Sequence, residues 1–544
     1  MDPQLKLWLE RQQSFVSKDV QNEISNLYSY EVLSTILSKI RGRKFSIMAD
    51  ATTDLSKQEQ FSLCLRYVND ELQVVESFVG FYELSLTERG TLCDGEALLC
   101  LVKDALLRFN LNLRDCRGHG YDGAANMSGR LNGLAAKFSS EVPEAIYVHC
   151  TAHSLDLVVQ EWLRTLPGIL CTLETVKEVY NLLEGSAKRH AVFEACRNAT
   201  NNTLSNLRPL CPTRWIMRGS AIHSLLENYE SVIVSLNVIS KDKSEAAAKA
   251  VGLINQLHKF NFIFHILLLE DLIPIFETLS RKLQTVGISY HTVRDEMEVV
   301  VNLLNQKRTE SSSERFWSEC IEWVDKEQSD ALKLPKQRRR PLRFDDGQDS
   351  YEFTDVKLFY RRTYYEIIDL ATNVLADRFD NEKFKLMHCI ERVLMSSCDE
   401  NNDGNEEELV IILNFYRNDF ADARTVKRHL RNLTDATKGK CIKSIPDLVK
   451  FFHAHTSMQV FLEQAFKMLE IYLVVPFSVA TNERTFSCLR RLKSYLRTCM
   501  TSNRLNSCAM MHIHSDILKN VDISCIARQF VLLNSKRIDL FGMI

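Results

Sequence analysis

The sequence lacks several features that would assign it to a class at once. It has sixteen cysteines among 544 residues but no CxxC pair, and cysteines spread in this way indicate a reducing intracellular compartment. No apolar run reaches the length of a membrane span, and the first residues, MDPQLKLWLERQQ, do not form a signal peptide. The formal net charge of −2 excludes a uniformly basic nucleic-acid binder, although a local basic face remains possible.

The composition that is present is that of an ordinary globular protein, with 45% hydrophobic and 25% charged residues. A chain of this length is expected to form two to four domains with a large core. Apolar residues at helical spacing predict helices over residues 1–42 and again from about 165 to 470.

The stretch between these helical regions predicts a sheet. Alternation of apolar and polar residues predicts strands over 45–49, 61–67, 72–84, a short stretch ending at Tyr121, and 145–148. Helical spacing predicts helices over 98–109 and 126–138. The order β-β-β-α-β-α-β predicts an α/β layered sheet in which three antiparallel strands are extended by parallel ones. This is the strand order of the ribonuclease H-like fold, in which the ends of the first and fourth strands lie side by side.

The long helical block is best explained as an insertion into this α/β domain. Helices are predicted over 173–183, 221–239, 246–268, 273–286, 293–304 and 356–379. Two charged segments interrupt them, 329–350 with KQRRRPLR and the acidic 396–408. The predicted domains are an N-terminal helical segment (1–42), the first part of the core (43–205), the helical insertion (206–455) and a C-terminal completion (456–544).

Three acidic residues stand at informative places. Asp50 ends the first predicted strand, and Asp122 follows the fourth within RGHGYDGAANMSG, whose glycines let the backbone turn sharply or approach a ligand. Adjacent strand ends would bring these two residues together, although Asp122 could equally cap a tight turn. Asn482 is a plausible helix N-cap with Glu483 in the first turn, where simple pairing with the helix dipole is the alternative.

Five motifs follow one another in a recognisable order. They are MADATTD around Asp50, GYDGAANMSG around Asp122, HCTAHSLDLVV around Cys150 and His153, PTRW at 212–215, and SVATNERTFSCLRRLKSYLR around Glu483. Over about residues 43–515 this resembles the hAT superfamily of cut-and-paste DNA transposases and the host proteins derived from them. The nearest branch is the one found behind MYM-type zinc fingers and in related repressor-like proteins. The resemblance implies a ribonuclease H-like catalytic core interrupted by a large all-α insertion, with a C-terminal segment that supports dimerisation.

The resemblance also implies a chemistry. Asp50, Asp122 and Glu483 would be the carboxylates of a DDE metal site, and His153 would act near the scissile phosphate. Carboxylates placed together repel unless a cation lies between them, and hard oxygen ligands suit Mg²⁺ or Mn²⁺. Such ions would support DNA cleavage and strand transfer. Cys150 and His153 resemble half of a zinc site, but no second pair has ligand spacing, and His153 could instead cap a helix or lie in the core.

Contacts with DNA are implied at two further places. Arg214 and Trp215 match a family motif whose aromatic ring stacks on an extruded base, with a core tryptophan as the alternative. Basic residues beside Glu483 would form a face for DNA: Arg484, Arg490, Arg491, Lys493 and Arg497. The loop with Lys336, Arg338, Arg339, Arg340 and Arg343 could contact phosphates, direct nuclear import or simply be solvated. We expect a nuclear protein that binds DNA, forms at least a dimer through its C-terminal segment and does not enter a membrane.

Two rival hypotheses remain open. Transposases of this type usually carry an N-terminal zinc finger, and no segment here has its Cys/His spacing. Either the finger is missing from this sequence or specific DNA recognition has been lost. A domesticated, non-catalytic regulator or scaffold that dimerises through the C-terminal segment is one rival. A nuclease acting on RNA–DNA hybrids is the other, which fits the fold but not the insertion. Metal dependence with loss on Asp122→Asn would separate enzyme from scaffold, and substrate preference would separate the two enzymes.

Overall fold

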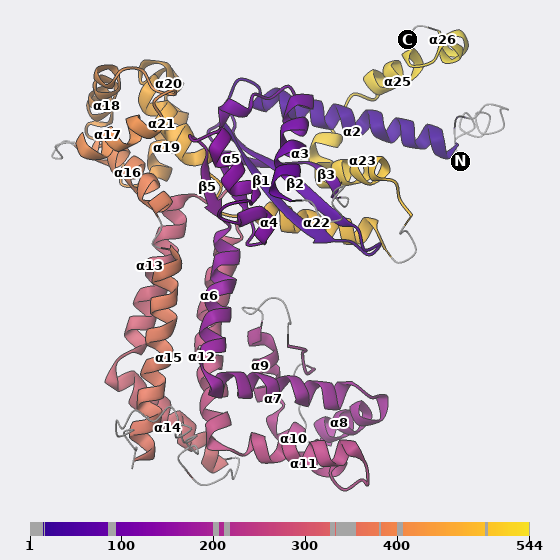
Figure 1. Cartoon of the computed structure of the whole chain (residues 1–544), viewed down its shortest axis with the longest axis vertical. Coiled ribbons are helices and arrows are strands. Elements are labelled where there is room, and N and C mark those ends of the chain that lie inside the picture. Colours follow the sequence, from indigo (N-terminus) through magenta and orange to yellow (C-terminus); the bar gives the residue numbers. More distant parts are fainter. Residues whose placement is uncertain are drawn as a thin grey trace. The chain divides into compact units, whose positions relative to one another are not determined.

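The computed structural model describes most of the chain, namely residues 15, 17–84, 94–199, 206–210, 218–326, 332, 355–379, 382–399, 406–494 and 499–542. In these residues the protein is mostly helical, with one small mixed sheet (Figure 1). Two compact units are present: Met1–His153, Gln284–Val293 and Glu382–Ile544 form the first, and Ser154–Leu283 and Arg294–Asn381 form the second. Within the described ranges, no helix combines the length and apolar character needed to cross a membrane.

The sheet lies in the first unit. Its strands are β1 (Phe45–Thr53), β2 (Glu59–Val68), β3 (Val74–Leu84), β4 (Cys116–Tyr121) and β5 (Ile146–His149). They lie in the order β3-β2-β1-β4-β5, with β1 antiparallel to β2, β2 antiparallel to β3, and β4 parallel to both β1 and β5. The predicted combination of antiparallel strands extended by parallel ones is therefore observed.

Helices of the first unit come from both ends of the chain. Those before the second unit are α2 (Lys18–Ile40), α3 (Gly95–Arg108), the short 3₁₀ helix η1 (Leu113–Asp115), α4 (Ala125–Ser128) and α5 (Leu134–Glu141). Those after it are α16 (Glu382–Ser396), α17 (Glu406–Phe415), α18 (Ala423–Thr437), α19 (Ile445–Ala454), α20 (Thr456–Phe461), α21 (Glu463–Val474), α22 (Ala480–Leu492), α23 (Ser502–Ile513), α24 (Ser515–Leu518), α25 (Ile523–Leu532) and α26 (Ser535–Phe541).

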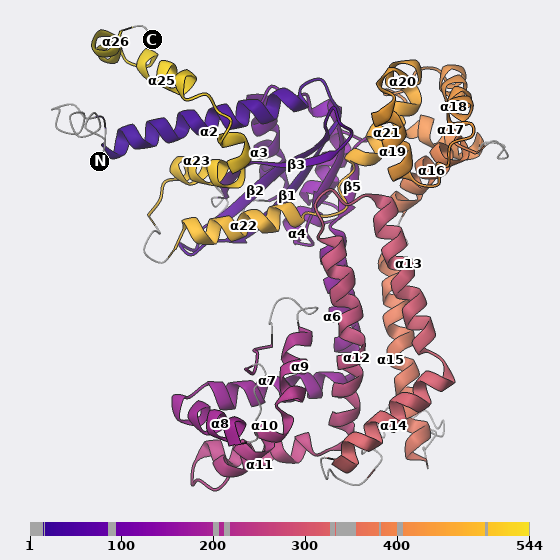
Figure 2. The ribbon, with the colours of Figure 1, turned by 180° about the vertical axis from the view of Figure 1, so that it is seen from behind.

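The late helices return to the sheet and cover it (Figure 2). Helix α22 contacts β1, β2 and β3, α21 contacts β2 and β4, and α23 packs against β3 and α2. Because of this cover, successive residues of β1 such as Ser46, Ile47 and Met48 are all buried, as in strands enclosed on both faces. The alternation that predicted β1 therefore does not mark a solvent-facing side.

The predicted helix over 126–138 is wrong as a single element. It consists of α4 and α5, which are separated by residues 129–133. The break is a tight turn built on two glycines, since a Cβ added to Gly133 would lie 2.4 Å from the backbone nitrogen of Gly129. Leu131, which was expected on the apolar face, lies at this turn and is 82% exposed.

All regular secondary structure in the described residues of the second unit is helical. It contains most of α6 (Thr151–Thr165), α7 (Pro167–Glu184), α8 (Ala187–Ala199), α9 (Gly219–Glu227), α10 (Tyr229–Ile239), α11 (Glu245–Leu257), α12 (Phe260–Leu283), most of α13 (Tyr290–Lys307), α14 (Glu310–Lys326) and α15 (Val356–Phe379). The predicted helix 221–239 is divided at Asn228, whose side chain donates a hydrogen bond to the Ser224 carbonyl. The predicted break before residue 273 is absent, because α12 continues with Pro274 inside it and buries a long apolar face.

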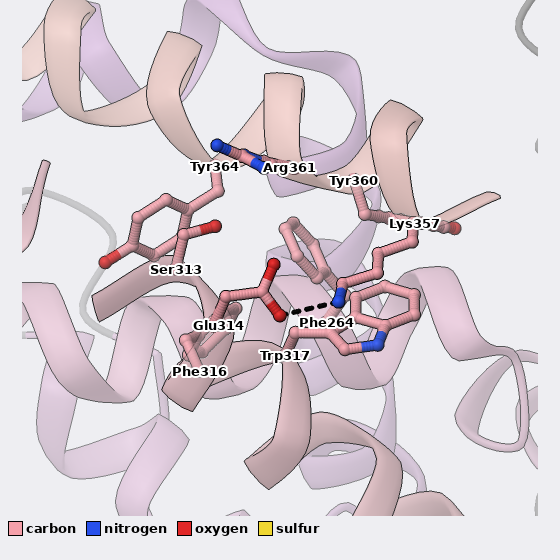
Figure 3. Close-up of a pocket in the computed structure, with 9 residues that line it drawn as sticks. All are labelled: Phe264, Ser313, Glu314, Phe316, Trp317, Lys357, Tyr360, Arg361 and Tyr364. Carbon is pink, nitrogen blue, oxygen red and sulfur yellow. Dashed lines mark hydrogen bonds and ion pairs between the residues drawn. The ribbon is translucent and has the colours of Figure 1, made fainter. Parts of the chain in front are cut away.

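Aromatic side chains fill the junction of α12, α14 and α15 in this unit (Figure 3). Phe264 lies 4.7 Å from Tyr360 and 5.4 Å from Phe316 between ring centroids. A small pocket beside these rings is bordered by the ion pair of Glu314 and Lys357, whose charged atoms are 2.5 Å apart. The rings are buried, so we interpret the cluster as the core that joins the three helices.

Candidate functional site

Asp50 and Asp122 lie at the same edge of the sheet. Strands β1 and β4 are parallel neighbours, and their last paired residues are Met48 and Gly120. Each aspartate lies two positions after the last residue of its strand in the β1–β4 pairing. Asp50 itself is still inside β1, and neighbouring strands are roughly 4.8 Å apart. The two predicted carboxylates therefore come from adjacent backbone positions, although 72 residues separate them in the sequence.

The first turn of α22 reaches this same edge. Asn482 lies within that turn and is not the N-cap that was predicted, because α22 begins at Ala480. Its side-chain amide donates hydrogen bonds to the carbonyls of Ser62, at 2.8 Å, and Met48, at 3.2 Å. Ser62 is the antiparallel partner of Asp50. Asn482 thus fixes the turn that carries Glu483 beside the end of β1.

The pKa of the Cys150 thiol is affected by the negative charges at this edge. Burial raises the pKa of the Cys150 thiol to about 12, and the nearby negative charges of Glu483 and Asp50 contribute in the same direction. Its sulfur accepts a hydrogen bond from the backbone N–H of Val479 at 3.4 Å. Thr151 next to it donates to the carbonyl of Phe477 through both its N–H and its hydroxyl. Cys150 therefore lies in the junction that holds the start of α22 against the start of α6.

The described side chains at this edge are not arranged as the ligands of a metal ion. Asp50 is 8% exposed and accepts a hydrogen bond from the N–H of Ala51, while Asp122 accepts one from Ala124. In the described part of the chain, no three His, Cys, Asp or Glu side chains are grouped so that they could hold a metal ion. The residue types would nevertheless suit a hard divalent cation.

Asp122 has two histidine neighbours, one of which the sequence motifs did not single out. A Cβ added to Gly123 would lie 2.7 Å from Nε2 of His153 and 3.1 Å from Nε2 of His149. The two imidazole rings meet edge to face with centroids 5.4 Å apart. Burial raises the pKa of Asp122, while the Ala124 hydrogen bond and the charge of His153 act in the opposite direction. The spacing of four residues between His149 and His153 was the available signal.

The glycines before Asp122 allow another segment of the same chain to pack closely against β4. A Cβ added to Gly118 would lie 2.7 Å from Cδ of Pro476, and one added to Gly120 would lie 3.3 Å from Cγ of the same proline. The close approach expected of these glycines is thus made by the segment that leads into α22. At Gly118 and Gly120 the neighbour is therefore the protein's own Pro476 and not a ligand.

Lys493 is not part of an exposed basic face. Its side chain is 3% exposed and its ammonium group lies 2.5 Å from a carboxylate oxygen of Asp54. Arg484 is exposed and donates to the Gln284 carbonyl, and Arg490 and Arg491 are exposed. Several other predicted positions lie outside the described residues, namely Arg214, Trp215, Arg497 and the basic loop residues Lys336, Arg338, Arg339, Arg340 and Arg343.

We call the end of the sheet near Asp50, Asp122 and Glu483 the acidic edge. Comparisons with known proteins match both segments of the chain that contain these residues. Residues 6–133, which include Asp50 and Asp122, match the family described as ZMYM1/FAM200, RNase-like domain. Residues 443–517, which include Glu483, match the hAT family C-terminal dimerisation region. These matches confirm the resemblance to the hAT superfamily of transposases and the host proteins derived from them that the motifs predicted.

Curated relatives extend the similarity over almost the whole chain. The Homo sapiens protein named 52 kDa repressor of the inhibitor of the protein kinase is 22% identical over 527 residues, which cover 94% of this chain and 67% of the relative. The Mus musculus protein of the same name is 22% identical over 528 residues with the same coverage.

Proposed function

We propose that the chain is a transposase-type protein whose acidic edge binds Mg²⁺ or Mn²⁺ and supports cleavage and strand transfer on DNA. Its architecture would be a ribonuclease H-like core interrupted by the helical insertion. The supporting observation is that Asp50, Asp122 and Glu483 come from three separate elements that meet at one end of the sheet. A bound divalent cation would offset the mutual repulsion of these carboxylates and supply Lewis-acid activation of an attacking water or 3′-hydroxyl.

The protein's own residues would complete this site. His153 lies against Gly123 beside Asp122, where its imidazole could hydrogen-bond a phosphate oxygen or carry a proton. Arg484, Arg490 and Arg491 are exposed on α22, the helix whose first turn carries Glu483, and are proposed to contact the DNA backbone. Arg214 and Trp215 retain the proposed role of holding an extruded base.

The experiment measures cleavage of end-labelled DNA by the full chain with Mg²⁺, Mn²⁺ or EDTA. Substrates are nicked DNA ends and an RNA–DNA hybrid of the same sequence. Asp122→Asn and Glu483→Gln should each reduce DNA cleavage by more than about 100-fold, which exceeds the typical cost of losing an outer-shell partner. Glu71→Gln is the matched control. Glu71 is exposed in the turn between β2 and β3, at the end of the sheet opposite to Asp50 and Asp122.

A second candidate function is that of a dimerising nuclear regulator without catalysis. It is favoured by the matched dimerisation region and by the repressor named among the relatives. Under this hypothesis the wild-type protein would sediment as a dimer and enter nuclei, yet it would cleave neither substrate with either metal. Cleavage that depends on Asp122 would exclude this candidate.

A further inference from the structure

Helix α18 presents a line of arginines on its outer face. Its inner face is apolar and buries Val426, Leu430 and Leu433. Arg424, Arg428 and Arg431 are all exposed, and their spacing of four and three residues places them along one stripe of the helix. One face of the helix therefore packs against the protein core, and the other exposes positively charged side chains.

This helix is held firmly in the first unit. The backbone N–H of Gln464, at the start of α21, donates to Nδ1 of His429 at 3.2 Å. The side-chain oxygen of Gln464 accepts the N–H of Ala421 at 2.9 Å. Figures 1 and 2 both place α18 beside α17 in the helical group that follows the second unit in the sequence. The arginine stripe is thus presented by a fixed element.

The charge around the stripe differs from that of the whole chain. Residues 421–443 contain seven Lys or Arg against two Asp, in a protein with a formal net charge of −2. Lys427 is paired with Glu406 at 2.6 Å, and Lys440 lies over the ring of Phe451. The three stripe arginines form no direct ion pair with a carboxylate among the described residues, although the charges of Glu406 and Asp422 interact with Arg431 and Arg424. Asp435 is the acidic residue that falls on the same stripe.

We propose that α18 is a binding surface for the phosphate backbone of duplex DNA. Arg424 and Arg431 are seven residues apart, which is about 10.5 Å along a helix axis and roughly three base-pair steps. Guanidinium groups suit phosphate because they donate two parallel hydrogen bonds. The row of arginines is held by a helix, and duplex DNA presents phosphates at regular spacing. Such a row matches DNA better than it matches an acidic protein segment of irregular structure. The surface lies outside both matched family regions.

This inference depends on the proposed function only in its choice of DNA as the ligand of α18. Its test therefore measures DNA binding in the absence of cleavage. Fluorescence anisotropy of a labelled mixed-sequence duplex is recorded in EDTA, with every protein carrying Asp122→Asn. The triple variant R424Q/R428Q/R431Q should raise the Kd more than about tenfold, and the slope of log Kd against log salt should fall by about 2.7, since each lost phosphate contact removes about 0.9. Asp435→Asn should instead tighten binding.

The matched control is K241Q/K243Q/K249Q, which removes the same charge from exposed positions of the second unit. Equal weakening by the control and the α18 variant would overturn the proposal, as would a duplex affinity unchanged by the α18 variant. Competition by polyglutamate as effective as that by DNA of equal charge would overturn it in favour of an acidic protein partner. A protein that binds duplex DNA through α18 but never cleaves it would support this surface while contradicting the proposed enzyme.

Discussion

Two aspartates that each follow a strand of the same sheet have opposite surroundings. Asp54 comes directly after β1 and accepts hydrogen bonds from the ammonium group of Lys493, the hydroxyl of Ser56 and the amide of Gln60. Asp122 comes directly after β4 and, in the described residues, accepts one hydrogen bond from a backbone N–H and pairs with no lysine or arginine. Among the described residues, a lysine neutralises the first carboxylate, whereas the second has only the imidazole of His153 near it.

The pKa values of the two groups follow from this difference. Burial raises the pKa of Asp54, but the hydrogen bonds led by that of Lys493 outweigh it and lower the value to about 2. Burial also raises the pKa of Asp122, and there the opposing contributions do not overcome it. A carboxylate neutralised by a lysine of its own chain stabilises the fold, whereas the half-buried Asp122, which pairs with no described lysine or arginine, is a candidate for binding an external cation. Asp54 is thus structural, and Asp122 is the better ligand candidate.

The largest expected effect comes from removing the internal cation. Lys493→Met leaves the Asp54 carboxylate buried without its partner, which should reduce the free energy of unfolding of the first unit by about 3–5 kcal/mol. Native-state hydrogen exchange of the β1 and β2 amides measures this unit separately from the second one.

The neighbouring exposed residue provides the control for this variant. Arg490→Met, in the last turn of the helix that ends just before Lys493, should change the stability by no more than about 0.5 kcal/mol. The double variant Asp54→Asn/Lys493→Met should recover part of the loss, because the uncompensated charge is gone. A loss as large for Arg490→Met as for Lys493→Met would show that the buried pair is not the cause.

The Asp54–Lys493 pair also shows where sequence reasoning ends. Alternation located the strands, and the strand order placed Asp50 and Asp122 together, because both are consequences of local pattern and simple topology. The partner of Asp54 is 439 residues away, and Lys493 was interpreted as a surface residue because its neighbours Arg490 and Arg491 are basic. Pattern alone could not show that the chain turns inward directly after them.

Asn482 and the glycines of β4 illustrate the same limit. An asparagine before an acidic residue is typical of a helix N-cap, but here its amide is used by two strand carbonyls far away in the sequence. Gly118 and Gly120 indicated a close approach, and the sequence could not say that Pro476 makes it. The residue types at the acidic edge were thus predictable, whereas the segments that support them were not.

A smaller effect is expected from pH. Because Asp54 has a pKa of 3.8 when unfolded and about 2 when folded, the unfolded chain takes up this proton first as the pH falls. Its stabilisation of about 2 kcal/mol is therefore complete above roughly pH 5 and is lost progressively between about pH 5 and pH 1. Hydrogen exchange or denaturant unfolding across this range, compared with Asp54→Asn, isolates the contribution. An identical pH profile for both proteins would contradict it.

The smallest effect, and the sharpest test of the comparison, is expected from Asp122→Asn in EDTA. The folded pKa of Asp122 is raised, so the folded chain holds this proton more tightly, and stability falls as the pH rises through the interval between the unfolded and folded pKa values. Removing the charge should then raise the free energy of unfolding at pH 7 by less than about 1 kcal/mol, with no gain near pH 3, where the carboxyl is protonated in both states. Asp54→Asn should act with the opposite sign at pH 7. If both substitutions destabilise the first unit alike, Asp122 is a structural carboxylate like Asp54, and the acidic edge loses its strongest ligand candidate.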